Sequence, residues 1–149
     1  MQEKNYEIID NTVGMNFIYI IRVLVFILGI LVLALGVATV ITARLGVATW
    51  DVLHIGLANL TGLSLGTWVQ IVGVVMVLMT CFFEKKRPAI GSVLNILLVG
   101  FFLNSILDLN IIPSFEGLTS QIILLIVGIV LMGIGSGMYV ASKVGAGPR

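Results

Sequence analysis

Charged side chains are scarce in this sequence of 149 residues, which has eight Lys and Arg and seven Asp and Glu. Charged residues make up 10% of the chain and hydrophobic residues 59%, and the mean hydropathy is +1.18. A soluble domain is about half apolar and about one quarter charged. The charge is too low for a soluble surface or for the basic face of a nucleic-acid-binding protein. The composition therefore indicates an integral membrane protein that is embedded in the lipid bilayer and binds no nucleic acid.

Cysteine and histidine each occur once, as Cys81 and His54. One cysteine cannot form an internal disulfide, and one cysteine with one histidine cannot form a clustered metal site. The sequence also shows no nucleophile–base pair. The glycine-rich stretch at 133–137 lies inside an apolar run, without the strand–turn–helix context of a phosphate-binding loop. We therefore expect no enzymatic activity, no metal and no cofactor.

Four uncharged apolar stretches are long enough, or nearly so, to cross a bilayer as helices. They cover residues 23–43, 67–83, 89–107 and 121–141. A helix needs about 20 residues to cross the hydrocarbon core, and only a helix satisfies its own backbone there. The sequence predicts an all-α polytopic protein with one membrane domain over residues 1–149. Residues 1–14 are polar, and we expect them to be loosely ordered.

The segment between the first two stretches is too apolar for a solvated loop. Trp50 to Thr61 can form a short helix, with Thr49 as its N-cap and Gly62 as its C-terminal stop. Twelve helical residues reach about 18 Å, which is less than the bilayer core. This length favours a short re-entrant or interfacial helix that enters from one side. A full crossing, giving five spans, is the alternative.

Basic residues indicate the orientation. With four spans, seven of the eight Lys and Arg fall on one side, including Lys85, Lys86 and Arg87 in one loop, and only Arg44 falls on the other. The excess of Lys and Arg on the cytoplasmic side predicts that this loop and the amino terminus are cytoplasmic. Five spans would divide the basic residues six to two, with the amino terminus outside, so the charge rule favours four spans.

Residues 28–46 and 127–145 match at an offset of 99 positions. The matched pairs include Gly29 with Gly128, Gly36 with Gly135, and Arg44 with Lys143. The match predicts an internal repeat, with copies at about 22–107 and about 121–149, and chance similarity between apolar helices is the alternative. Three crossings separate the matched helices, so the second copy would be inverted, as in many transporters. It stops where its short helix should begin, so we expect this repeat to be incomplete.

The matched glycines form small-residue surfaces, which are typical of close helix packing in membranes. We therefore expect the first and fourth spans to pack together across a pseudo-symmetry axis. The expected contact joins Gly36 and Gly135, where a cysteine crosslink would test it.

Four polar side chains in or beside the spans form the candidate site: Asp51, His54, Gln70 and Asn95. Asp51 and His54 share a helix face, and an ionisable pair in a membrane protein is costly and therefore a functional candidate. In the alternative, Asp51 caps its own helix and His54 meets a carbonyl or water. Gln70 and Asn95 either hold helices together by hydrogen bonds or line a substrate path.

The sequence LGVATWDVLHIGL at 45–57, followed by Gly62, Gly66 and RPAIGSVLN at 87–95, resembles the YczE/YyaS/YitT group of bacterial membrane proteins. The YczE branch is the most similar, with Thr49 in place of a usual proline. The resemblance extends from about residue 22 to the end. It implies a multi-pass protein of the bacterial cytoplasmic (inner) membrane.

The inverted repeat favours a transporter-like protein for an unknown small molecule or ion. The alternative is an accessory protein that stabilises another membrane protein or forms a homo-oligomer.

Overall fold

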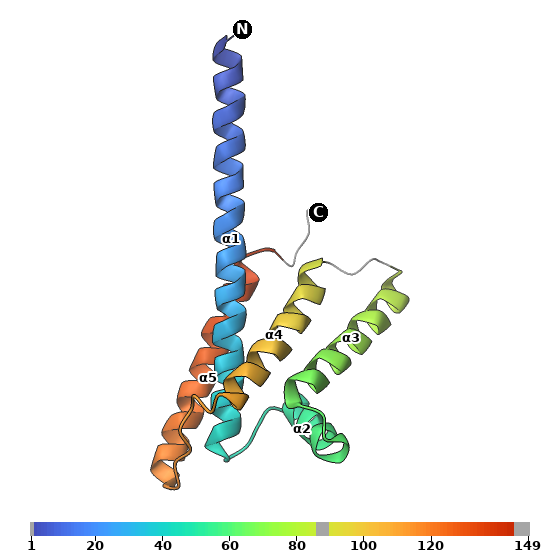
Figure 1. Ribbon diagram of the computed structural model, residues 1–149, viewed down its shortest axis with the longest axis vertical. Coiled ribbons are helices and arrows are strands. Elements are labelled where there is room, and N and C mark those ends of the chain that lie inside the picture. The colour runs from blue at the N-terminus through green and yellow to red at the C-terminus, as the bar shows by residue number, and fades with distance from the viewer. Residues whose placement is uncertain (1, 86–89, 145–149) are drawn as a thin grey trace.

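The computed structural model describes residues 2–85 and 90–144, and the regular structure within these ranges is helical (Figure 1). The helices are α1 (Gln2–Ala43), α2 (Thr49–Thr61), α3 (Leu65–Glu84), α4 (Ile90–Asp108) and α5 (Leu118–Ala141). Four of them contain apolar spans, at Ile18–Ala43, Leu65–Phe83, Gly91–Asp108 and Leu118–Ala141. The predicted all-α fold with four long apolar helices is confirmed.

The four long helices alternate in direction (Figure 1). α1 and α4 run one way, and α3 and α5 run the other way. Because α1 ends and α3 begins at the same end of the molecule, the intervening segment with α2 enters and leaves there. The structure therefore has the short half-helix and not a fifth span.

α2 packs against α3, and its two ends are formed differently. Ala48, not Thr49, is the N-cap residue, and its side chain makes no capping hydrogen bond. The expectation that Thr49 caps the helix was therefore wrong, because Thr49 already has helical geometry. At the other end, the predicted stop at Gly62 is confirmed: its φ is 73° and its N–H donates to the carbonyl of Ala58 at 2.9 Å.

The first helix is longer than its membrane span. α1 begins at Gln2, so the expectation of a loosely ordered amino-terminal segment was wrong for residues 2–14, and residue 1 lies outside the described residues. Once the span has formed a helix, each added residue gains a hydrogen bond without a new nucleation cost. Residues 2–17 also contain no proline that would interrupt such an extension.

α1 and α5 form the most extensive helix pair, and they meet at glycines. A Cβ on Gly36 would lie 2.6 Å from the backbone N of Met132 and 2.9 Å from the carbonyl O of Gly128. A Cβ on Gly29 would lie 3.0 Å from the carbonyl O of Gly135. The expected pairing of Gly36 with Gly135 was wrong, because antiparallel helices bring the beginning of one against the end of the other.

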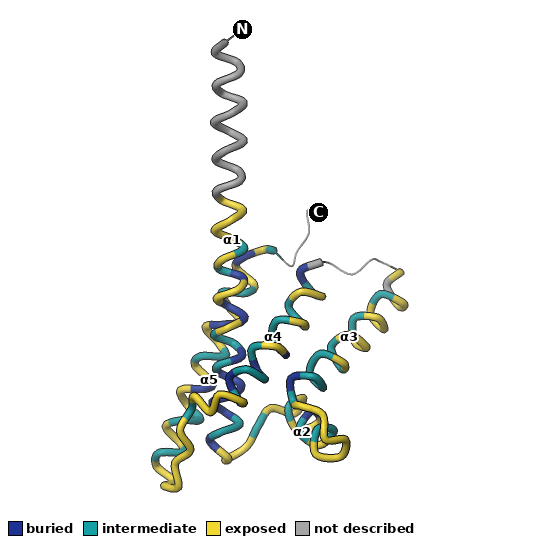
Figure 2. Tube along the Cα trace, in the orientation of Figure 1, coloured by how far each residue is buried: buried dark blue, intermediate teal, exposed yellow. Residues whose placement is uncertain are grey.

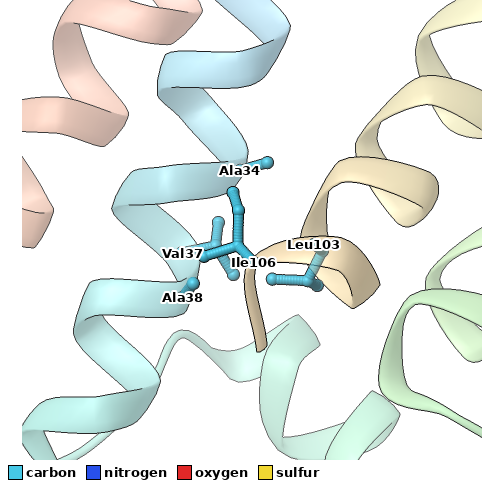
Figure 3. Packing of buried hydrophobic residues seen from close by; sticks show 5 residues of the cluster. All are labelled: Ala34, Val37, Ala38, Leu103 and Ile106. Carbon is cyan, nitrogen blue, oxygen red and sulfur yellow. The ribbon is translucent and has the colours of Figure 1, made fainter. Parts of the chain in front are cut away.

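α4 covers a second face of α1. The core cluster between them contains Ala34, Val37, Ala38, Leu103 and Ile106 (Figure 3). Small side chains on α1 let the branched side chains of α4 approach its backbone, as is typical of helix packing in membranes. Buried residues therefore concentrate along the span of α1 (Figure 2).

The glycine contacts predict a selective loss of stability. Gly36→Ala places a methyl group against the backbone of α5, so we expect the free energy of unfolding to fall by about 1–3 kcal/mol. Gly133→Ala, on the same pair of helices, is the control, because a Cβ there meets nothing within 4 Å among the described residues. We expect that control to change stability by no more than about 1 kcal/mol. Reversible unfolding in mixed detergent micelles measures both, and equal losses would contradict the close approach at Gly36.

Candidate functional site

A cleft of about 450 Å³ lies among α1, α2, α3 and α4. Leu33 lines it from α1, and Val69, Gly73 and Met76 line it from the middle of the α3 span. The lining is mostly apolar, and two of the predicted polar residues, His54 of α2 and Asn95 of α4, are part of it. The structure therefore brings together two candidates that are distant in sequence.

His54 is almost fully enclosed, with 8% of its surface exposed. Its Nδ1 atom is buried and has no hydrogen-bond partner among the described residues. The nearest charged atom is Oδ1 of Asp51 at 4.0 Å, which is too far for a hydrogen bond but close enough for electrostatic attraction. A buried polar atom without a partner costs about 1–3 kcal/mol, so this histidine does not serve as a well-bonded core residue.

Asn95 of α4 has the same feature. Its Oδ1 atom is buried and has no hydrogen-bond partner among the described residues. In an amide that holds helices together, this oxygen would accept a hydrogen bond from a neighbouring helix. For Asn95, the arrangement favours the interpretation in which it lines a substrate path.

Asp51 lies in the first turn of α2, outside the four spans. Burial raises the pKa of the Asp51 carboxyl, while His54 and the Ala48 backbone N–H counteract part of that rise. Burial lowers the pKa of His54, and the Asp51 carboxylate opposes this shift. Both shifts favour the neutral forms of the pair. The bond to Ala48 also agrees with the alternative in which Asp51 caps its own helix.

Gln70 lies outside the cleft lining and has a structural role. Its Nε2 donates to the carbonyl of Leu97 at 2.8 Å, which joins α3 to α4. The interpretation of Gln70 as a residue that holds helices together is therefore the one that its geometry supports.

Asn104 is not among the predicted site residues, but it joins two helices. Its Oδ1 accepts a hydrogen bond from the N–H of Gly66 at 2.8 Å, and its Nδ2 donates to Oγ of Ser64 at 2.8 Å. Asn104, on the neighbouring helix α4, thus provides hydrogen-bond partners for polar groups at the beginning of α3. No local pattern in the sequence reveals this role, because the two partners are about 40 positions away in the chain.

The predicted topology residues are only partly described. Lys85 follows α3 as its C-cap, with a φ of 52°. Lys86 and Arg87 lie outside the described residues.

Comparison with known proteins places these features in a family. The family model described as "Family of unknown function (DUF6198)" matches residues 20–149. The chain belongs to this family. It is 38% identical over 122 residues to the "Uncharacterized membrane protein YczE" of Bacillus subtilis (strain 168). It is 27% identical over 124 residues to the "Uncharacterized protein YyaS" of the same organism. These names confirm the YczE-like resemblance and support a membrane location.

The family members that match are longer than the matched region. The alignment to YczE covers 81% of this chain but 56% of that relative, and the alignment to YyaS covers 81% and 61%. An uncharacterized protein of Haemophilus influenzae is 32% identical over 129 residues, which cover 87% of this chain and 57% of that protein. The chain therefore spans less than two thirds of these relatives. No solved structure matches the chain.

The different environments of two asparagines predict opposite effects of one substitution. Asn104→Leu removes the acceptor of the Gly66 N–H, so we expect the free energy of unfolding to fall by about 1–3 kcal/mol. Asn95→Leu removes an oxygen that has no partner in the described part of the chain and fills part of the cleft, so stability should stay the same or rise. Thermal unfolding of the two purified variants in one detergent compares them. An equal loss for Asn95→Leu would show that its oxygen is bonded and that Asn95 is structural.

Proposed function

We propose that the chain binds a small, mostly apolar molecule with a hydrogen-bonding group in the cleft, as part of a transporter-like protein. The observation that carries this proposal is a pair of buried polar atoms, His54 Nδ1 and Asn95 Oδ1, in residues that line one cleft. Neither atom has a hydrogen-bond partner within residues 2–85 and 90–144. A ligand group that bonds to either atom removes a desolvation cost that the protein otherwise bears.

The size and lining of the cleft suit such a ligand. Small-molecule sites enclose about 300–1,000 Å³ and combine apolar walls with a few placed polar groups. The cleft, with about 450 Å³, has this composition. Gly73 lets α3 approach α4 closely beside the cleft, since a Cβ there would lie 2.8 Å from the side chain of Ile96.

Two features of the architecture support transport. Transporter sites often lie beside discontinuous or half-helices, next to the interface between inverted repeats. Trp50, in the first turn of the half-helix α2, lines the cleft. Leu33 also lines it, while the backbone of Leu33 packs against Gly135 of α5. Movement between α1 and α5 would therefore change the cleft directly.

The orientation is part of the proposal. The excess of Lys and Arg supports an orientation with the amino terminus and the loop between α3 and α4 in the cytoplasm of a bacterial cell. The cleft would then lie near the middle of the spans, with α2 on its outer side.

An accessory role is the second candidate. It is favoured by one observation, the exposed small residues Gly133, Ser136 and Gly137 on α5, which suit contact with another helix. In this role the cleft would hold lipid and would not need water.

The two roles predict different access of water to the cleft. In a Cys81→Ser background, Val99→Cys places a thiol on the cleft lining. A thiol reacts with a membrane-impermeant methanethiosulfonate only as a thiolate in contact with water. We expect modification of Val99→Cys in membrane vesicles. Val75→Cys is the matched control on the exposed side of α3, where Val75 is 48% exposed and would face lipid.

The result separates the candidates. Modification of Val99→Cys, with Val75→Cys unreactive, is the pattern of a water-accessible path. If both thiols remain unmodified from both sides of the membrane, the transport proposal is contradicted and the accessory role stands.

A further inference from the structure

The contacts between α1 and α5 are reciprocal under the repeat offset of 99 positions. A two-fold axis generates such pairs, because residue i contacts the counterpart of j and residue j contacts the counterpart of i. Three sets show this: Gly29–Tyr139 with Val40–Gly128, Gly36–Met132 with Leu33–Gly135, and Gly29–Gly135 with Gly36–Gly128. The two matched helices therefore pack as equivalent, oppositely directed units.

The ends of the two helices are equivalent as well. Arg44 and Lys143, which match in the repeat, have φ values of 57° and 56°. The N–H of Arg44 donates to the carbonyl of Ile41 at 3.3 Å, and the N–H of Lys143 donates to the matching carbonyl of Val140 at 3.3 Å. A left-handed conformation is uncommon for these side chains, so its recurrence adds independent support for the repeat.

The equivalence ends at one face. Ala34, Val37 and Ala38 of α1 are buried against Leu103 and Ile106 of α4. Their counterparts on α5 are Gly133, Ser136 and Gly137, and all three are exposed. A Cβ on Gly133 or Gly137 would meet nothing within 4 Å in the part of the chain that the structure describes.

We propose that Gly133, Ser136 and Gly137 form a docking surface for a transmembrane helix that is the counterpart of α4 in a second repeat. This helix runs parallel to α5, as α4 runs parallel to α1. It presents two branched apolar side chains at positions i and i+3, as α4 presents Leu103 and Ile106. This inference does not depend on the proposed function of the cleft, but it assigns to a second repeat the residues that favour the accessory role.

Two observations identify this occupant. The docking surface is the symmetry counterpart of an interface that is already formed, and it has the same small-xxx-small spacing as Ala34 and Ala38. The relatives also contain sequence outside the match that could form such a helix, since the match covers only 56% of YczE and 61% of YyaS.

A second copy of the chain is the rival occupant. Two α5 helices could meet through Gly133 and Gly137, because this spacing supports helix dimers. The α4 of a second copy is a poorer candidate, since its Leu103 and Ile106 already pack on its own α1.

Photochemical crosslinking in the native membrane tests the proposal. Val140 is 68% exposed and is the counterpart of Ile41, which packs against the α1–α4 cluster. A diazirine analogue of leucine at position 140 should join a transmembrane peptide that has the α4 pattern and belongs to a YczE-like second repeat. The same probe at Val127, which is 45% exposed, is the control and should join lipid, because its counterpart Leu28 is itself 50% exposed and lies outside the α1–α4 cluster.

Two substitutions check that the small residues form the surface. Gly137→Ala, which copies Ala38 of α1, should keep the adduct. Gly137→Leu should lower its yield by about tenfold, from the cost of overpacking. The melting temperature should not fall, because a Cβ at that position meets nothing within 4 Å among the described residues and leucine favours a helix over glycine. Adducts with lipid alone at position 140, an adduct between two 16.0 kDa chains, or no effect of Gly137→Leu would each overturn the proposal.

Discussion

The close approach of α1 and α5 is the constraint on which the other contacts depend. Lipid tails are as apolar as the helices, so helices associate there by close packing and not by the hydrophobic effect. Gly36 and Gly128 allow that packing because neither carries a side chain. One face of α1 therefore packs against α5. The adjacent face, which carries Ala34 and Ala38, packs against α4. α4 in turn positions α3 through Asn104 and Gln70, and α3 positions α2.

The polar side chains of the membrane region fall into two kinds. Gln70 and Asn104 make hydrogen bonds between α3 and α4, and they keep the apolar helices in one register. His54 and Asn95 carry buried polar atoms without partners among the described residues, and both line the same cleft. An unsatisfied polar atom costs stability in every membrane protein. Two such atoms, one on His54 and one on Asn95, belong to residues that line one cleft, and this is the physical reason for proposing that the ligand binds there.

Much of the fold follows from the sequence, because bilayer thickness fixes the length of a span and Gly62 fixes the end of α2. The matched glycines also predict that α1 and α5 pack together. Their pairing was predicted wrongly. The repeat aligns Gly36 with Gly135, but in the antiparallel helix pair Gly36 contacts Gly128, and Gly135 contacts Gly29. The roles of the amides were open for a related reason: a bond such as that of Asn104 depends on which helix lies opposite.

We propose that α1 and α5 are inverted copies of one unit. Leu45 and Val144 are equivalent positions just beyond the two helices, and replacing either with cysteine leaves every charge in place. In a Cys81→Ser background, an impermeant maleimide added to sealed vesicles of each orientation reports the side on which each thiol lies. Inverted copies predict that Leu45→Cys and Val144→Cys are labelled from opposite sides of the membrane. Labelling of both from the same side would contradict the inverted arrangement.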